Sequence, residues 1–527
     1  MLTLDEIRDK TPEEIYNIHF TALTEKSNLL KQRDHEIDQL RWRINKLLHD
    51  QYGKRSEKQA SPDQERLFDE FATQETEVVA STEASNEEKN VITVPEHQRK
   101  KKGRPALPKD LPRVTRTYDL TDEEKRCSCG CELTKIGEKK KEQLEFIPAQ
   151  VRVIEHVRYQ YACRDCEEVM KLAQMPKQPI PKGIASPGLL SHVLVSKFQD
   201  HLPFYRQEHI LKRMGITLNR NSFCTWTQQC AELLRPLIKA MQSIIVNYDI
   251  GYSDETRLQV LKEDGRKAES LSYMWLFIGG EEQRRCFIYQ YHPSRAHTIP
   301  KAFWGGFKGY LHSDGFSGYQ TLFKDETVQM QGLHCWAHTR RKFIDAAKQS
   351  KKATLANWAV KEIAELYKLE KQFKKQNYSA QQVYEQRQKK SIPILNKIKS
   401  WLNEHIKQVP PKHPIGEAMS YALKFWSNLI RYTDDGRFEI DNNRTERGIK
   451  PFVIGRKNWL FHDSPNGAEA GAVIYSLIET CKAHEINPYL YLRYVLQEIP
   501  NSDKSEQTYE SLLPFNIDHD KIWELNR

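Results

Sequence analysis

Two aspartates lie where a sheet could place ligands for a divalent cation. Asp254 lies within the strand-like run GYSDETRLQVL (251–261). A carboxylate among apolar neighbours there costs desolvation free energy unless a cation compensates it. Asp314 ends a second strand-like run, GYLHSDGFSGY (309–319), just before a glycine. Ligand sites in open α/β sheets lie at the carboxyl ends of strands, so Asp314 is expected at such a site.

A third carboxylate, Glu446, lies in the stretch DNNRTERGIK (441–450). Asp441 and Asn442 suit the N-cap of a helix, and Glu446 then falls in its first turns, near the positive end of the helix dipole. Alone, this pattern describes only a capped surface helix. Together with the two aspartates it supplies three hard oxygen ligands of the kind that Mg²⁺ or Mn²⁺ prefers. Two such ions ~4 Å apart activate an attacking hydroxyl and stabilise the leaving oxygen of a phosphodiester.

The elements around the aspartates predict a ribonuclease H-like α/β domain. Three strands, a helix, a strand, a helix and a strand are expected in that order. The first and fourth strands are neighbours in this topology, which allows Asp254 and Asp314 to share a cation. Glu255 should point to the opposite face of its strand and is left outside the site. The strand-like runs are 251–261, 271–280, 285–292, 309–319 and 328–338.

A long segment separates Asp314 from Glu446. Its 131 residues are too many for a simple loop, and residues 345–430 are helix-rich and strongly charged. We therefore expect a helical insertion within the catalytic domain.

Five of the ten cysteines lie between positions 127 and 166, in a chain whose other features indicate a reducing compartment. Cys163 and Cys166 form a C-x2-C pair, and a C-x-C-x-C cluster precedes them. We expect a structural zinc site of four thiolates, Cys127, Cys129, Cys163 and Cys166, with Cys131 as the alternative ligand. Five free thiols without a metal are the alternative.

Cys335 and His338, with His334 beside them, suggest a second possible metal site. Residues three apart at the start of a helix face one way. A buried cysteine beside a hydrogen-bonded histidine is the alternative.

Residues 204–234 have the layout of a helix-turn-helix. One helix is expected to end near Met214, and a second to open at Asn221. Arg213 and Arg220 would then lie where DNA phosphates and base edges are reached. A purely structural pair of helices is the alternative.

Two further groups have the composition of DNA contacts. Arg104 lies in the basic run RKKKGRPALP (99–108), which suits a narrow minor groove or phosphate contacts alone. Arg456, Lys457 and Trp459 combine charge for phosphates with a ring for base stacking.

Residues 23–48 show a heptad pattern, which predicts either a short coiled coil that pairs chains or an amphipathic helix packed on a neighbour. Apolar residues recur at Leu23, Leu30, Ile37, Ile44, Leu40 and Leu47.

Composition limits the class of protein. The 527 residues carry 81 Lys+Arg against 71 Asp+Glu, a formal charge of +10 that is gathered in local clusters and favours a polyanionic partner. No apolar stretch approaches the ~20 residues of a membrane span, and no signal-peptide core is present, so a soluble cytoplasmic protein is expected.

Five motifs make the chain similar to transposases of the insertion sequence 66 family, which are bacterial DDE enzymes. They are SDETRLQVL, HSDGFSGY, CWAHTRRKF, DNNRTERGIKPFVIGRKNWLF and the cysteine module, and they are preceded by the heptad segment. The resemblance implies a catalytic triad at Asp254, Asp314 and Glu446 and metal-dependent cleavage and strand transfer at terminal inverted repeats.

The resemblance also implies the partners: double-stranded DNA, further copies of the chain in a synaptic complex, and small accessory proteins of the same element, with nucleoid association. A ribonuclease H-like nuclease or resolvase, and a DNA-binding regulator with an inactive catalytic domain, are the alternatives.

The expected domains follow from these motifs. They are a leucine-zipper segment (1–52), a disordered basic linker (53–109), a zinc module (110–175), a helix-turn-helix-like region (176–246), the first part of the catalytic core (247–344), a helical insertion (345–435), the second part of the core (436–500) and a tail (501–527).

Overall fold

The computed structural model describes Arg33 and residues 151–162, 170–325, 329–348, 354–518 and 521–522. Residues 68–157 form a unit of their own, and the description below concerns the other unit. The predictions for the heptad segment, Arg104 and the cysteine module lie outside the described residues.

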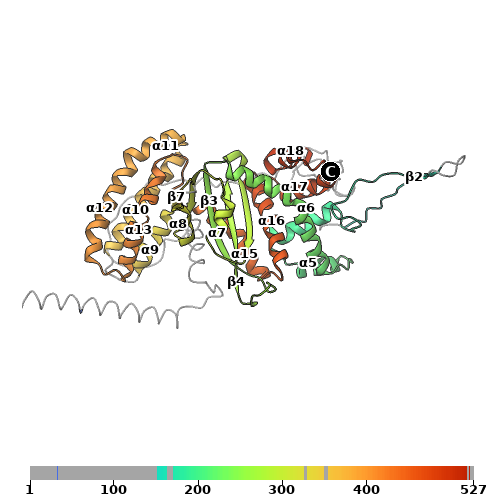
Figure 1. Ribbon diagram of the computed structural model, residues 1–527, viewed down its shortest axis with the longest axis horizontal. Coiled ribbons are helices and arrows are strands. Elements are labelled where there is room, and N and C mark those ends of the chain that lie inside the picture. The colour runs from blue at the N-terminus through green and yellow to red at the C-terminus, as the bar shows by residue number, and fades with distance from the viewer. Residues whose placement is uncertain are drawn as a thin grey trace, which may run out of the picture. The chain divides into compact units, whose positions relative to one another are not determined.

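A five-stranded mixed sheet carries the two aspartates. Its strands lie in the order β5-β4-β3-β6-β7 (Figure 1). β3 pairs antiparallel with β4 and parallel with β6, so the expected neighbourhood of the first and fourth strands is present. Each of the five expected strands is found: β3 Ile250–Gln259, β4 Leu271–Gly279, β5 Cys286–His292, β6 Gly309–Ser313 and β7 Met330–His334.

The two helices between these strands and the helix of Glu446 were also expected from the sequence. The helices that accompany the sheet are α7 Thr298–Phe303, α8 Ser317–Phe323, α9 Trp336–Lys348, α15 Asn443–Trp459 and α16 Pro465–Ala483. Beyond the catalytic strands and helices lie the short strands β1 Gln160–Ala162 and β2 Met170–Leu172, and the C-terminal helices α17 Pro488–Glu498 and α18 Glu506–Ser511. None of the helices in the described ranges is long and apolar enough to cross a membrane.

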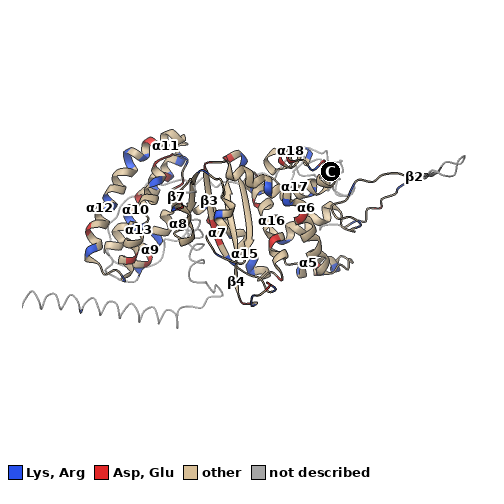
Figure 2. Ribbon diagram, viewed as in Figure 1, with Lys and Arg blue, Asp and Glu red and all other residues tan. Residues whose placement is uncertain are grey.

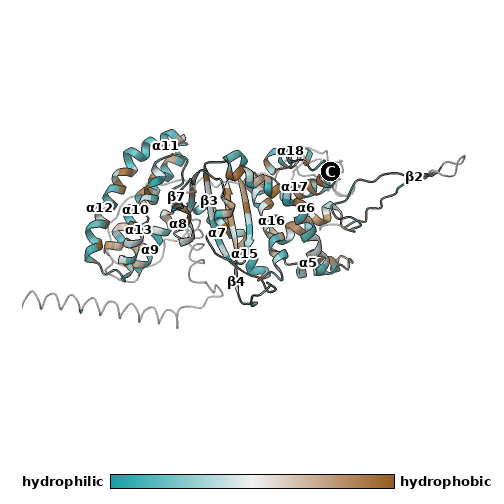
Figure 3. Ribbon diagram, viewed as in Figure 1, coloured by the Kyte–Doolittle hydropathy of each residue, from teal (hydrophilic) through white to brown (hydrophobic). Residues whose placement is uncertain are grey.

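The two faces of the sheet meet different helices. Phe277 of β4 stacks on Phe303 of α7, with ring centroids 3.7 Å apart. Its neighbour Leu276 points the other way, because side chains alternate along a strand. There Leu276 meets α15, where a Cβ on Gly448 would come within 2.8 Å of its Cδ2. Hydrophobic residues accordingly gather in the central strands, which helices cover on both faces (Figure 3).

Helix α16 covers the open edge of β5. The backbone N–H of Tyr289 donates to Ser476 Oγ at 2.8 Å, and that of Phe287 donates to Thr480 Oγ1 at 3.0 Å. The two hydroxyls lie one helical turn apart and the two N–H groups two residues apart, so helix and strand match along their length. Unpaired edge donors are a liability for a sheet, and these are satisfied by side chains.

The region before the sheet contains α4 Pro187–Phe198, α5 Phe204–Arg213 and α6 Arg220–Val246. The two helix ends expected around the turn are close to those found. Helix α6 runs for 27 residues, far beyond a recognition helix, and its C-terminal part meets the sheet, where Ile245 packs against Gly279. The second helix of the pair is therefore also a core element of the catalytic unit.

The helical insertion is present between α9 and α15. Charged residues are distributed along its helices α10 to α13, as Figure 2 shows, whereas α14 has none. The elements are α10 Thr354–Lys375, α11 Ala380–Gln386, a π-helical turn Arg387–Ser391, α12 Ile392–His405, α13 Pro414–Lys424 and α14 Trp426–Ile430.

A buried arginine ties the insertion to the chain that leads into α15. The guanidinium of Arg387 pairs with Glu370 at 2.8 Å and donates to the backbone carbonyls of Tyr432, Asp435 and Phe438. Every donated bond reaches a fixed acceptor, so segment 432–438 is held before α15 begins.

Candidate active site

Asp254 lies on the face of the sheet that α15 covers. It pairs in register with Leu276, whose side chain meets α15, and residues directly opposite in a strand pair share a face. The side chain is half-buried, and its Oδ1 accepts the N–H of Glu255 at 2.8 Å. Strand β3 therefore directs this carboxylate toward the helix that carries Glu446.

Asp314 directly follows β6, at its carboxyl end. The parallel register pairs Tyr252 with His312, so Asp254 and Asp314 each lie two residues further along neighbouring strands. Its Oδ1 accepts the N–H of Phe316 at 3.0 Å, which fixes the carboxylate across the turn into α8. The two aspartates thus reach the same level of the sheet.

Glu446 lies in the first turn of α15, and its side chain is 1 % exposed. Asn442 is the N-cap residue, but its side chain caps no helix N–H; its Oδ1 accepts the Thr445 hydroxyl at 2.6 Å instead. Asp441 accepts two hydrogen bonds from Asn443: the backbone N–H donates to Oδ1 at 3.2 Å, and the side-chain amide donates to Oδ2 at 2.8 Å. Of the two expected cap residues, Asp441 alone therefore binds a backbone N–H at the start of the helix.

The three carboxylates influence one another electrostatically. Burial raises the pKa of Asp254 well above its usual value, and the negative charges of Asp314, Glu255 and Glu446 raise it further. Burial also raises the pKa of Asp314, which the Phe316 N–H and the Arg295 guanidinium lower in part. Grouped, half-buried carboxyls of this kind fit a divalent cation, because the cation compensates the charge that burial and proximity disfavour.

Glu255 also interacts with this group, although sequence reasoning left it out. It does point away from Asp254, because the Tyr319 hydroxyl contacts both Glu255 and Ser253 on the other face. Its Oε1 pairs with Arg295 Nη2 at 2.5 Å. Burial first, and then the charge of Asp314, raise the pKa of Glu255 to about 7. Alternation along β3 correctly predicts the face on which Glu255 lies. It does not predict the electrostatic interaction of Glu255 with Asp314 at the end of β6.

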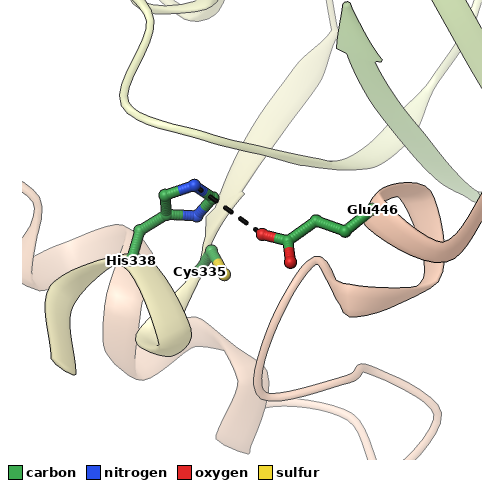
Figure 4. A group of neighbouring side chains, drawn as sticks. All are labelled: Cys335, His338 and Glu446. Atoms are coloured by element: carbon green, nitrogen blue, oxygen red, sulfur yellow. Dashed lines mark ion pairs between the residues drawn. The ribbon is translucent and has the colours of Figure 1, made fainter. Parts of the chain in front are cut away.

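Cys335 and His338 lie beside Glu446, not in a site with His334. In the described part of the chain, one group of three His, Cys, Asp or Glu side chains has its potential ligand atoms within 4.8 Å of one another. The three are Cys335, His338 and Glu446 (Figure 4). His334 instead bonds the Tyr421 hydroxyl at 2.9 Å and stacks on Phe425. The Cys-x2-His spacing is visible in the sequence, but only the fold shows that Glu446 completes the group.

The residues expected to contact DNA differ in setting. Arg213 and Arg220 are exposed on either side of the turn between α5 and α6. On α15, Lys457 is exposed, whereas Arg456 donates to the backbone carbonyl of Arg257. Trp459 is half-buried and packs edge-on against Phe452 and His462, so part of its ring is already in contact with protein.

Comparison with known families decides the identity of the chain. The family model described as "Transposase IS66 family" matches residues 182–470, which span the sheet, the insertion and α15. The chain belongs to the IS66 transposase family. Further models match residues 124–167 (zinc-finger binding domain of transposase IS66), 476–515 (IS66 C-terminal element) and 39–116 (Transposase C of IS166 homeodomain). The IS66 resemblance seen in the motifs is confirmed, and the expected zinc-finger and leucine-zipper segments are supported.

Relatives of similar length occur in Sinorhizobium fredii (strain NBRC 101917 / NGR234). The protein y4jD is 33 % identical over 79 % of this chain and 82 % of its own length. The protein y4hP is 30 % identical over 90 % of this chain and 88 % of its own length. Both are described as uncharacterized, so the likeness assigns no chemistry to this chain.

Proposed function

We propose that this chain binds the terminal inverted repeats of a bacterial insertion sequence and catalyses metal-dependent strand cleavage and strand transfer there. The observation that supports the proposal is that three acids from distant segments lie near enough to interact electrostatically: Asp254 in β3, Asp314 after β6, and Glu446 on α15. The charges of the other two raise the pKa of Asp254. The strand order, with three antiparallel strands and two parallel ones, supports a ribonuclease H-like fold for this domain.

Asp254, Asp314 and Glu446 would hold Mg²⁺ or Mn²⁺, two ions per site, through carboxylate oxygens. Bound metal supplies Lewis-acid stabilisation of the attacking and leaving oxygens. The protein's own contribution is positioning. β3 and β6 fix the aspartates at one level, and the Phe316 N–H orients Asp314. The cation Arg295 keeps Asp314 more readily ionised than burial alone would allow.

Structural Zn²⁺ is proposed in the module matched by the zinc-finger model, with Cys127, Cys129, Cys163 and Cys166 as ligands and Cys131 as the alternative. DNA contacts are proposed at Arg104, Arg213, Arg220, Arg456 and Lys457, with Trp459 as a stacking residue. A homo-oligomeric synaptic complex and small accessory proteins of the element complete the proposed assembly.

The test is cleavage and joining of duplex DNA that carries the ends of the element, with Mg²⁺. Asp254→Asn, Asp314→Asn and Glu446→Gln should each abolish both steps. Double variants should be hardly worse, because residues that act as a unit do not add. DNA binding should survive, since phosphate contacts are made elsewhere. Asp463→Asn, which removes an exposed acid paired with Lys262, is the matched control and should retain activity.

Two results would overturn the proposal. One is near-normal cleavage by Glu446→Gln. The other is accumulation of a covalent protein–DNA adduct, because water or a 3′-hydroxyl should be the nucleophile. Cleavage without joining would favour a nuclease or resolvase of the same fold.

A further inference from the structure

Glu446 has a second set of neighbours besides the aspartates. Cys335 lies between β7 and α9, and His338 lies in the first turn of α9. Glu446 reaches them from α15, with its Oε1 3.7 Å from His338 Nε2 (Figure 4). Chain segments more than a hundred residues apart thus bring one sulfur, one nitrogen and one oxygen together.

The sulfur is held as metal-bound thiolates are held. The backbone N–H of Asn442 donates to Cys335 Sγ at 3.2 Å. The Cys335 side chain is fully buried, and the backbone N–H of His338 faces the sulfur as well. A buried thiol that two N–H groups face gains most by ionising on a cation, which replaces the lost hydration.

The histidine also suits a ligand role. Its ring is half-buried, with 24 % of the side chain exposed. Nε2 is the ring nitrogen that lies 3.7 Å from Glu446 and would bind the ion, whereas Nδ1 is buried and makes no hydrogen bond. A neutral imidazole with an unshared electron pair is the form that binds a metal.

The donor set selects the class of ion. Thiolate and imidazole favour Zn²⁺ and similar ions, whereas Mg²⁺ takes oxygen ligands. Ligand atoms around a tetrahedral zinc ion lie about 3.3–3.8 Å apart, given its usual bond lengths. A nitrogen and an oxygen lie at the lower end of this range, about 3.3–3.5 Å apart. The 3.7 Å between His338 Nε2 and Glu446 Oε1 is a few tenths of an ångström longer, and the sulfur lies within 4.8 Å of both.

We propose that Cys335, His338 and Glu446 bind one thiophilic divalent cation of the Zn²⁺ class, and that this ion withholds Glu446 from Asp254 and Asp314. The three acids do not form a group as close as the Cys–His–Glu group in this structure. The inhibitory consequence rests on the proposed function: Zn²⁺ should suppress cleavage supported by Mg²⁺. The binding of the ion does not depend on it.

Binding is tested on the full-length chain with Co²⁺, which reports thiolate ligation by charge-transfer absorption. The absorption spectrum of the wild type minus that of Cys335→Ser should show one thiolate–Co²⁺ band. The cysteine module contributes equally to both spectra and is removed by the subtraction. His338→Gln and Glu446→Gln should each weaken Co²⁺ affinity at this site by tenfold or more. Cys224→Ser, which removes an exposed thiol on α6, should leave the spectrum unchanged.

Thermal unfolding must first show that each variant is folded, and His338→Gln serves if Cys335→Ser is not. Identical Co²⁺ spectra and affinities for wild type and a folded ligand variant would overturn the site and leave a packed cysteine beside a histidine.

Inhibition is tested separately. Micromolar Zn²⁺ should inhibit Mg²⁺-supported cleavage by wild type, and at least tenfold more should be needed for Cys335→Ser. Equal sensitivity would overturn the inhibitory role. If Co²⁺ binds as described and no DNA cleavage is ever observed, the proposed function fails and the metal site stands.

Discussion

Arg295 pairs with Glu255 across 2.5 Å, on the opposite face of β3 from Asp254. The same guanidinium lowers the pKa of Asp314, so one cation serves carboxylates on both sides of the strand end. The Arg295 guanidinium carbon lies 4.0 Å from the centroid of the Phe316 ring. This contact holds the guanidinium over the turn that follows Asp314.

Removing this cation should shift the pH dependence of cleavage. The metal-binding carboxyls act only when ionised, so activity is lost as the pH falls through their raised pKa values. Arg295→Gln removes an influence that lowers the pKa of Asp314, so the acid limb should move to higher pH. Arg284→Gln, which breaks an exposed pair with Glu510, should leave the profile unchanged. An acid limb that stays in place in Arg295→Gln would contradict the coupling.

The buried ion pair of the insertion should be costly to break. Arg387→Met leaves Glu370 and three carbonyls without their donor, which should destabilise the chain by about 3–5 kcal/mol. Lys368→Met, in an exposed pair with Glu365, should cost no more than about 0.5 kcal/mol. Denaturant unfolding measures both. Equal effects would show that Arg387 does not hold segment 432–438.

The covered edge of β5 predicts a cost at a small polar residue. Ser476→Ala leaves the buried N–H of Tyr289 without an acceptor, so we expect a loss of about 1–3 kcal/mol. Ser511→Ala, an exposed helical serine bonded only to the nearby Thr508 carbonyl, is the control and should be close to neutral. Hydrogen exchange at the Tyr289 amide should also accelerate in Ser476→Ala. Unchanged protection there would contradict the assignment of the bond.

The contact of α15 with the sheet predicts opposite signs for two similar substitutions. A Cβ at Gly448 would lie 2.8 Å from Leu276 Cδ2, so Gly448→Ala should destabilise by about 1 kcal/mol or more after its gain in helix propensity. Gly467→Ala meets nothing nearer than 3.6 Å and should stabilise by about 0.5–1 kcal/mol. Thermal unfolding gives both signs. A stabilising Gly448→Ala would show that α15 is not packed this closely.

Local pattern predicted much of this fold. Strand-like runs in the sequence marked all five strands, and the Asp-Gly at 314–315 marked a strand end correctly. What local pattern missed depends on long-range packing. The meeting of Glu446 with Cys335 and His338 requires α15 to pack beside α9, across an insertion whose length hides the contact. The choice between Asp441 and Asn442 as the cap was equally open, because both residue types bind helix N–H groups well and only the backbone path selects one.

The chain just after β7 and the chain just before α15 flank the insertion, and a backbone hydrogen bond joins them. The Trp336 N–H donates to the Ile440 carbonyl at 3.2 Å, two residues before the Asn442 N–H meets Cys335. The stretch between them is therefore a closed loop with a fixed, narrow neck. The entropy of closing a loop grows only slowly with its length, by about 0.6 kcal/mol for each doubling. The sheet should therefore tolerate relatives whose insertions are much shorter or longer, with no change in where Glu446 begins its helix.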